Sequence, residues 1–314
     1  MHNIDTECLL RLLERQKASW STVADNYAAL EQVMTKRIIL PGCNVTAMHN
    51  PARILSTASK PGKSNPDAGS CFLCAEKRPA EQEGIPFAGR YSILVNPYPI
   101  FKRHYTIAAL THTEQRIEGR FGDMLRLSVR LNGLTVFYNG AECGASAPHH
   151  AHFQAGESGV MPIEDEWRSA AEIVAGNNSG EIYRLSESLR NAFVIESGNA
   201  DYVEESFGNI CAAARHGHDK GEPMMNVLAR YIDERWTVFV FLRKKHRPSF
   251  YGSDGEGRML VSPASVEMGG LLILPRREDF DKITAAIVTE LYNEVCIDNG
   301  EADCIVSKLK KKTV

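Results

Sequence analysis

Three histidines lie within four positions of this chain, and a glutamine follows them closely. The segment reads Pro-His-His-Ala-His-Phe-Gln, with imidazoles at His149, His150 and His152 and an amide at Gln154. A run of Gly, Ala and Ser before it predicts a loop, and residues 150–154 are predicted to form a strand. Because alternate side chains of a strand share a face, His150, His152 and Gln154 are expected on the same side.

The spacing along that face separates the roles that these side chains can take. Same-face neighbours on a strand lie roughly 7 Å apart, which is too far for two imidazoles to act in one small cluster without other groups. We therefore expect one histidine to be structural or metal-bound, the next to be reactive, and the glutamine to donate to a substrate. The alternative is a run of histidines that only fills the core or the surface.

The stretch from Phe137 to Gln154 carries a family resemblance. It reads Phe-Tyr-Asn-Gly-Ala-Glu-Cys-Gly-Ala-Ser-Ala-Pro-His-His-Ala-His-Phe-Gln. It resembles the active-site segment of the galactose-1-phosphate uridylyltransferase branch of the histidine-triad superfamily, and His-x-His-Phe-Gln-Ala is still more similar to the GDP-hexose phosphorylases of that branch. There, glutamine replaces the third histidine of the triad and the second histidine is the nucleophile, which implies His152. The extra residue, His149, departs from the uridylyltransferase pattern and is shared by the phosphorylases.

The resemblance implies a two-step nucleotidyl transfer. A neutral imidazole, with an ordinary pKa near 6.5, is available as a nucleophile at neutral pH. Its attack on the α-phosphorus would give a covalent nucleotidyl-histidine and ping-pong kinetics. Ser146 and Gln154 are expected to donate to the phosphoryl oxygens, and Asn139 either to do likewise or to fix the loop. The second ring nitrogen of His152 should be held by an acceptor such as a main-chain carbonyl.

A second motif, Ser-Cys-Phe-Leu-Cys-Ala, predicts a metal site. Cys71 and Cys74 form a Cys-x-x-Cys pair, a common zinc half-site, although redox motifs and chance also produce it. No second such pair follows, so histidines would complete the site. The resemblance implies a structural Zn²⁺ whose other ligands are His112 and His150; the alternative is that the thiols only pack. His104, which opens a predicted strand, is a rival ligand for which we favour a structural role.

Several further residues match segments of the same branch. Arg53, in Asn-Pro-Ala-Arg, is a candidate phosphate clamp or an ordinary surface arginine. Asn96 matches an asparagine near the nucleoside, but it also suits a turn before proline. Arg243 and Lys244, in a basic run, are candidates to bind a sugar phosphate or free phosphate, or belong to a solvated turn. Glu267, beside Gly-Gly, is a candidate contact for sugar hydroxyls.

The elements that must position these residues predict an α+β fold. A strand–strand–helix pattern occurs in each half, which predicts two related α+β modules. The resemblance implies that both are histidine-triad-like modules of the uridylyltransferase kind. The first, residues 1–165, would hold N-terminal helices, the zinc site and the catalytic strand; the second would span residues 166–314. The expected strands are 91–95, 104–110, 135–138, 237–242 and 271–274; the expected helices are 116–134 and 279–295, after a helical pattern from Leu9 to Met34 and a loop at 58–70.

Composition bounds the partners and the compartment. The chain has 314 residues, 43% hydrophobic and 24% charged, with a net charge of −3. These values are typical of a globular protein and offer no basic field for nucleic acid. No apolar run reaches the roughly 20 residues of a membrane span, and residues 1–15 lack the features of a signal peptide. We expect a cytoplasmic protein with reduced cysteines, and the resemblance implies a possible homodimer.

The resemblance implies an enzyme that acts on a nucleotide-sugar, with phosphate or hexose 1-phosphate as the acceptor. One alternative is a dinucleoside-polyphosphate phosphorylase or hydrolase of the same superfamily. Others are a nucleotide-binding protein without turnover and a zinc-stabilised interaction module. The base, the sugar and the acceptor cannot be read from the sequence.

Overall fold

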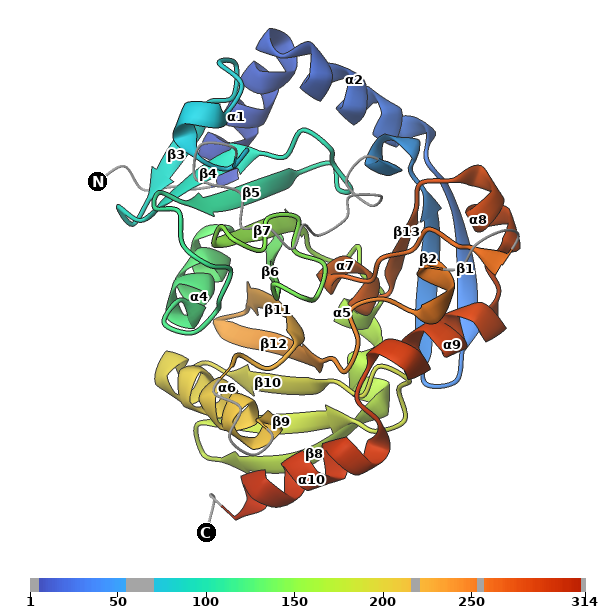
Figure 1. The fold of residues 1–314 in the computed structure, drawn as a ribbon. Coiled ribbons are helices and arrows are strands. Elements are labelled where there is room, and N and C mark those ends of the chain that lie inside the picture. The colour runs from blue at the N-terminus through green and yellow to red at the C-terminus, as the bar shows by residue number, and fades with distance from the viewer. Residues whose placement is uncertain (1–5, 55–70, 216–220, 253–256, 312–314) are drawn as a thin grey trace.

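The computed structural model describes residues 6–54, 71–215, 221–252 and 257–311, and the loop predicted at 58–70 lies outside them. Figure 1 shows a mixed fold in which strands form the centre and helices lie around them. The helices are α1 (Thr6–Ser19), α2 (Ser21–Ala29), α4 (Phe121–Arg130), α5 (Ile163–Glu166), α6 (Ala200–Ala214), α7 (Ser265–Met268), α8 (Arg277–Lys282), α9 (Ala285–Val295) and α10 (Asn299–Lys310). The strands are β1 (Met34–Leu40), β2 (Cys43–His49), β3 (Gly84–Phe87), β4 (Tyr91–Val95), β5 (His104–Ala109), β6 (Leu134–Asn139), β7 (His152–Glu157), β8 (Ala171–Asn177), β9 (Gly180–Leu185), β10 (Phe193–Ser197), β11 (Met225–Ile232), β12 (Arg235–Leu242) and β13 (Leu271–Leu274).

The large sheet has ten strands and contains the same unit twice. Its order is β3-β4-β5-β7-β6-β11-β12-β10-β9-β8, and every neighbouring pair is antiparallel. From each edge inward, three consecutive strands are followed by the fifth and then the fourth strand of the unit. In both units a helix, α4 or α6, lies between the third and fourth strands. The predicted α+β fold of two related modules is therefore confirmed. The sheet is continuous between the two units, because β6 of the first pairs with β11 of the second. The predicted domain boundary at residue 165 stays a prediction.

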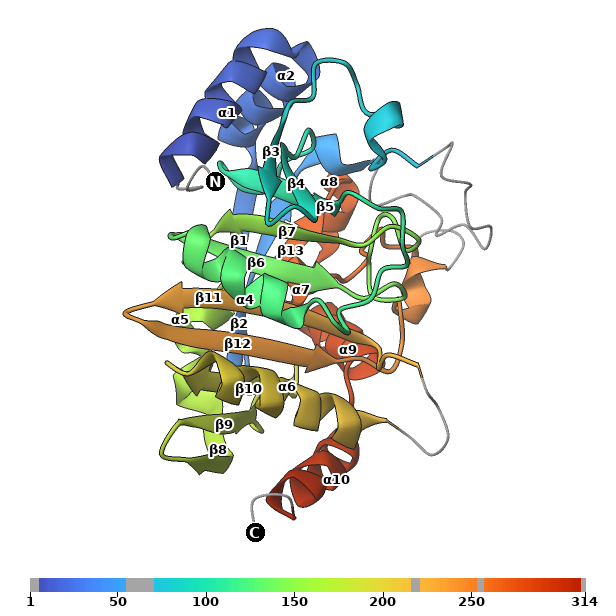
Figure 2. The same cartoon turned by 90° about the vertical axis from the view of Figure 1, so that its left-hand side faces the viewer.

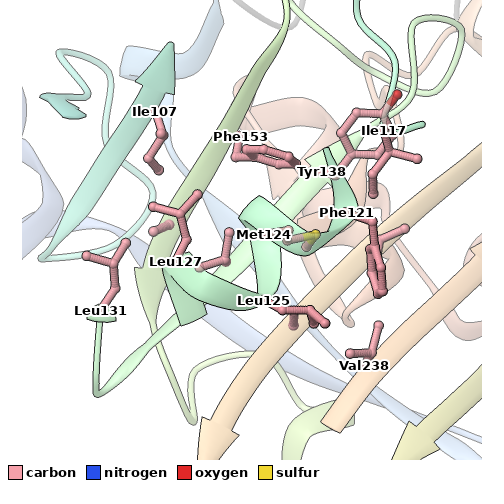
Figure 3. Packing of buried hydrophobic residues seen from close by; sticks show 14 of the residues in the cluster. Ile107, Ile117, Phe121, Met124, Leu125, Leu127, Leu131, Tyr138, Phe153 and Val238 are labelled. Atoms are coloured by element: carbon pink, nitrogen blue, oxygen red, sulfur yellow. The ribbon is translucent and has the colours of Figure 1, made fainter. Parts of the chain in front are cut away.

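Strand alternation divides the side chains of the sheet between two cores. On β12, Val238 and Val240 belong to the core under α4 and α6, whereas Phe239 belongs to the core on the opposite face. Figure 2 shows α4 and α6 in front of the sheet, with β1, β2 and β13 behind it. The close view in Figure 3 places Met124 of α4 near Tyr138 and Phe153 of the sheet. Period-two alternation of apolar residues thus produces a sheet that is buried on both faces.

The second face is covered by segments from both ends of the chain. β1 and β2 pair antiparallel, and β13, more than 200 residues later, pairs parallel with β2. This three-stranded sheet packs with α9 and the segment before β13 over the large sheet. The active-site motif on β7 therefore faces elements of both modules.

Two predicted helices are shorter than expected, each for a local reason. The helix predicted over 116–134 begins at Phe121 and ends at Arg130. Gly119 and Gly133, just outside it, have φ of 71° and 78°, in the left-handed region that a right-handed helix excludes. The helix predicted over 279–295 is split, because Ile283 is extended and Thr284 caps α9 by accepting from the Ile287 N–H.

The strand that carries His152 also begins later than predicted. β7 starts at His152, and His150 lies in the bend before it. His150 therefore does not share a strand face with His152 and Gln154, which corrects the expectation. In the described part of the chain, no helix is long and apolar enough to cross a membrane.

Candidate active site

A cavity of about 760 Å³ lies on the sheet face opposite α4 and α6, and both modules line it. The alternation of side chains along the strands determines which residues form the floor of the cavity. Phe153 of β7 packs toward α4, so His152 and Gln154 face the cavity, and the same parity brings Asn139 of β6 to that side. The opposite wall comes from the second module, through residues 246–247 and 262–267.

His152 is held so that one ring nitrogen is available in the cavity. Its side chain is 4% exposed, and Nδ1 donates to the main-chain carbonyl of His150 at 2.8 Å. Nε2 is buried and has no hydrogen-bond partner among the described residues. Burial lowers the pKa of His152 to about 4. At neutral pH the ring is therefore uncharged, with its proton on Nδ1 and a lone pair on Nε2.

The amide of Gln154 is oriented by its neighbours. Its Oε1 lies 3.0 Å from His104 Nε2 and 3.4 Å from the amide nitrogen of Asn96. His104 Nδ1 accepts from the Ile100 N–H at 3.1 Å, so its proton must sit on Nε2, from which it donates to Gln154. Burial lowers the pKa of His104 to about 3, which keeps the ring in this neutral tautomer. With the oxygen of Gln154 engaged, its NH₂ group is the donor left for the cavity.

Asn139 is oriented in the same manner by the second module. Its Oδ1 accepts from the Asn226 amide at 3.0 Å and from the Ser265 N–H at 2.7 Å. Asn226 and Asn139 are register partners where β6 meets β11, at the join between the two units. The engaged oxygen again leaves an NH₂ donor for the cavity. Two amide donors and the His152 nitrogen therefore face one cavity.

The other predicted cavity residues occupy varied positions. Ser146 is exposed and lines the cavity from the loop before β7. Arg53 lines it too, and its Nη1 donates to the Tyr98 carbonyl at 2.8 Å. Asn96 forms the turn, since its Oδ1 accepts from the Tyr98 N–H at 2.9 Å, and its amide reaches Gln154. Glu267 lines the opposite wall, where its Oε2 accepts from the Ala264 N–H at 2.9 Å.

Arg243 and Lys244, which were predicted either to bind a phosphate or to belong to a solvated turn, do not line the cavity. Arg243 is 5% exposed and donates to Asn226 Oδ1 at 2.6 Å. It also donates to the carbonyls of Val295, Pro263, Lys245 and His246. Lys244 points to solvent. The basic run thus contains one structural arginine, whose burial was not visible in the sequence.

Gln115 is a positioning residue that the sequence reasoning missed. It is 2% exposed, and its Nε2 donates to the carbonyls of Asn139 and His152 at 2.9 and 3.0 Å. Its Oε1 accepts from the His152 N–H at 2.8 Å. One side chain therefore connects the end of β6 to the start of β7. The only signal was its place three residues after His112, in a segment with no predicted element.

The four predicted metal ligands converge on one point. The ligand atoms of Cys71, Cys74, His112 and His150 all lie within 4.8 Å of one another. Cys71 Sγ is 3.3 Å from His150 Nδ1, and Cys74 Sγ is 3.2 Å from His112 Nδ1. These distances fit the roughly 3.5 Å edges of a tetrahedron built with the bond lengths of a Cys₂His₂ metal site. His104 is not part of the cluster.

The second nitrogen of His150 also fits metal binding. His150 Nε2 lies 2.9 Å from the Ala109 carbonyl, an arrangement that fixes the tautomer of a ligating histidine. The main-chain carbonyl of the same residue accepts from His152 Nδ1. A metal held by this cluster would therefore immobilise the residue that orients His152.

Known structures of other proteins share the fold of this chain. Yeast Ap4A phosphorylase Apa2 in complex with Ap4A matches with a TM-score of 0.60 and 16% identity, covering 89% of this chain and 97% of that chain. The complex of the same enzyme with AMP matches with a TM-score of 0.57 and 17% identity, over 86% and 93%. A uridylyltransferase mutant aligns over 89% and 99% with 13% identity and a TM-score of 0.40. The chain therefore shares its fold of paired modules with yeast Ap4A phosphorylase, and its second half matches a GDPGP1-like domain, both of which agree with the resemblance.

Family models divide the chain into two matched parts. Residues 12–157 match a domain of unknown function, DUF4922, and residues 164–311 match the GDPGP1-like, C-terminal domain. No curated protein sequence matches the chain.

Proposed function

We propose that this protein is a nucleotidyltransferase or phosphorylase that acts on an NDP-hexose through a covalent nucleotidyl-His152. The observation that carries the proposal is the state of His152. Its Nε2 faces a cavity large enough for a nucleotide, without a partner among the described residues, while Nδ1–H is held by the His150 carbonyl. A neutral imidazole with a fixed tautomer is what nucleophilic catalysis by histidine requires.

In the first step, the Nε2 lone pair attacks the α-phosphorus of the donor. The bond from phosphorus to the bridging oxygen breaks, and hexose 1-phosphate leaves with that electron pair. The NH₂ groups of Gln154 and Asn139 donate to the α-phosphoryl oxygens, and the Ser146 hydroxyl adds a donor from the loop. As the ring becomes cationic, the hydrogen bond from Nδ1–H to the His150 carbonyl strengthens.

Three further residues complete the proposed donor site. Arg53 would pair with donor phosphates, as guanidinium geometry favours. Asn96 acts through Gln154, whose oxygen it helps to hold. Glu267 lies on the wall opposite the nucleophile and would accept from sugar hydroxyls. The acceptor is phosphate or hexose 1-phosphate, which takes the nucleotide in the second step.

We further propose that the metal at Cys71, Cys74, His112 and His150 is structural Zn²⁺. The donor set of two sulfurs and two imidazoles is typical of closed zinc sites. Bound zinc would supply a cross-link and no chemistry. The chain's own part is the His150 carbonyl, which orients His152 whether or not the transfer is under way.

The second candidate is a dinucleoside-polyphosphate phosphorylase. What favours it is the fold shared with yeast Ap4A phosphorylase over nearly the whole chain. The same His152 chemistry would apply, with a dinucleoside polyphosphate as donor and a nucleotide in place of hexose 1-phosphate as the leaving group. The two candidates differ in the donor and not in the nucleophile.

Intact-protein mass spectrometry tests both candidates. The protein is incubated with GDP-, UDP- and ADP-hexoses and with dinucleoside polyphosphates, beside the His152→Asn variant. We expect the mass of one nucleoside monophosphate to be added to the wild type and not to the variant, and the added mass names the base. If no donor labels the wild type while several raise its melting temperature, the protein binds nucleotides without transferring them, and the proposal is wrong.

A further inference from the structure

We propose that Arg247, His246 and Ser262 form an anion subsite that receives the phosphate group of the acceptor in the second half-reaction. This inference rests on the proposed function. The ligand class is a phosphate dianion, either inorganic phosphate or the phosphate of a hexose 1-phosphate. The sequence pattern predicted phosphate binding at Arg243 and Lys244 of the same basic run, and not at these three residues.

Their place in the cavity separates them from the donor groups. All three line the cavity that contains His152 and Gln154. They belong to the second module, between β12 and α7, whereas the nucleophile and its amide donors lie on β6 and β7 of the first. An acceptor held by this wall would enter from the side opposite the strand that carries the nucleotide.

The side chains have the chemistry of an oriented phosphate site. Arg247 Nε donates to Ser262 Oγ at 2.8 Å, and its guanidinium lies 4.1 Å from the centre of the Tyr251 ring. A planar cation fixed by a ring and a hydroxyl matches the geometry of phosphate oxygens. His246 Nε2 is buried and has no hydrogen-bond partner in the described ranges. It is therefore a polar group that a ligand can satisfy.

The turn that carries Arg247 is braced before any ligand arrives. Arg243 donates to the carbonyls of Lys245 and His246 at 3.1 and 2.9 Å. On the other side, the Glu294 carboxylate accepts from the Ser249 N–H at 2.8 Å and also pairs with Lys245. Such support lowers the entropy that an anion must overcome to bind. It also gives the buried Arg243 a role: it holds the turn and does not contact the anion.

The second step balances without an added reagent. An oxygen of the acceptor dianion attacks the α-phosphorus of nucleotidyl-His152. The new phosphorus–oxygen bond forms as the bond to Nε2 breaks, and the electron pair returns to Nε2. The proton stays on Nδ1, so the ring leaves neutral and no proton has to move. With inorganic phosphate the product is a nucleoside diphosphate, and with hexose 1-phosphate it is a nucleotide-sugar.

The test follows the discharge of the covalent intermediate. Wild type, Arg247→Gln and Arg258→Gln are loaded with the labelling donor, desalted and mixed with inorganic phosphate or with glucose 1-phosphate. Arg258 is an exposed arginine of the same module that does not line the cavity, so its variant controls for the loss of one charge. Intact mass gives both the loading rate and the discharge rate.

We expect Arg247→Gln to discharge on the order of 100-fold more slowly with the true acceptor, and to load more slowly as well, because the phosphate that leaves in the first step occupies the in-line position that the acceptor phosphate takes in the second. Arg258→Gln should match wild type in both steps, and hydrolysis by water should be unchanged. The acceptor that shows the defect identifies the source of the phosphate group. Equal discharge by Arg247→Gln and wild type would overturn the proposal, and so would an equal slowing of hydrolysis by water.

A binding measurement keeps the subsite testable if no donor labels the wild type. Sodium phosphate is titrated against melting temperature at constant ionic strength. A stabilisation of wild type and Arg258→Gln that is lost in Arg247→Gln supports the anion subsite even when the proposed function fails. If phosphate raises the melting temperature of all three proteins equally, the proposed subsite is wrong.

Discussion

Replacing Gln115 by leucine tests whether a single buried amide positions the nucleophile. Leucine keeps most of the side-chain volume but removes both the donor and the acceptor. The change leaves three main-chain groups without their partner: the carbonyls of Asn139 and His152 and the N–H of His152. All of them lie at the point where β6 and β7 diverge, and water has little access to them.

The size of the effect follows from those three groups. A buried polar group that loses its hydrogen bond costs about 1–3 kcal/mol, and leucine recovers part of this by burying apolar surface. We expect a loss of about 3–5 kcal/mol in the free energy of unfolding. For a chain of this size, that corresponds to a fall in melting temperature of roughly 6–15 °C. A displacement of His152 by about 1 Å would slow nucleotidylation on the order of 100-fold.

Urea unfolding gives the first quantity and the loading rate by intact mass gives the second. Gln115→Glu is the matched variant, because it keeps an acceptor for the His152 N–H but places a carboxylate against two carbonyls. Glu114→Gln, on the exposed neighbour, is the control and should change neither quantity. If Gln115→Leu unfolds within 1 kcal/mol of wild type, as a rough experimental margin, and loads at the same rate, the side chain does not hold the strand.

The remaining predictions concern charge, metal and amide orientation. Because burial lowers the pKa of His152 to about 4, the loading rate should be constant from pH 7 down to about pH 5 and fall by half near pH 4. A pH–rate profile that instead falls around pH 6.5 would contradict a buried, neutral ring. Below about pH 6.5 the His152 ring binds a proton in the unfolded chain but not in the folded protein, so the free energy of unfolding should fall as pH drops from 6.5 toward 4. His152→Asn should remove this contribution, which urea titrations at pH 5 and 7 measure. Substitution of Cys74 by serine should lower both bound zinc, measured by elemental analysis, and the melting temperature, and chelation should not lower that variant further. Asn226→Asp should lower kcat about 10- to 100-fold with little change in KM, because Asn139 loses the donor that orients its amide; equal kcat values in steady-state assays would refute this.

The sequence located the candidate nucleophile because the signals around it are local. Period-two alternation put His152 and Gln154 on one face and Phe153 on the other, and the structure has this arrangement. The Cys-x-x-Cys pair was equally visible, and the resemblance supplied the two distant histidines that the fold brings beside it. The predicted role of each residue stays a prediction, but their proximity is now a fact of the structure.

The roles of Gln115 and Arg243 could not be predicted from the sequence, because they depend on burial and on main-chain partners. Gln115 bonds only to main-chain groups of β6 and β7, so no residue type near it in the chain reveals its role. Arg243 belongs to a basic run that is typical of solvent or phosphate contact. Its five acceptors come from β11, the 245–246 turn, the segment before α7 and the last residue of α9, which only the fold assembles.

The duplicated sheet explains how one cavity can hold two substrates that never need to meet. The strand of the second unit that corresponds to β7 is β12, which reads Arg-Trp-Thr-Val-Phe-Val-Phe-Leu and has neither histidine nor glutamine. Under the proposed function, the first unit would therefore form the covalent intermediate and the second would supply a wall of the cavity. The pairing of Asn139 with Asn226 joins the two units at the cavity floor. The amide of Asn139 in the first unit is therefore oriented by Asn226 of the second unit. Changes in the 246–262 wall should then alter the acceptor without touching the nucleophile, whereas changes at Asn226 should affect the transfer to every acceptor.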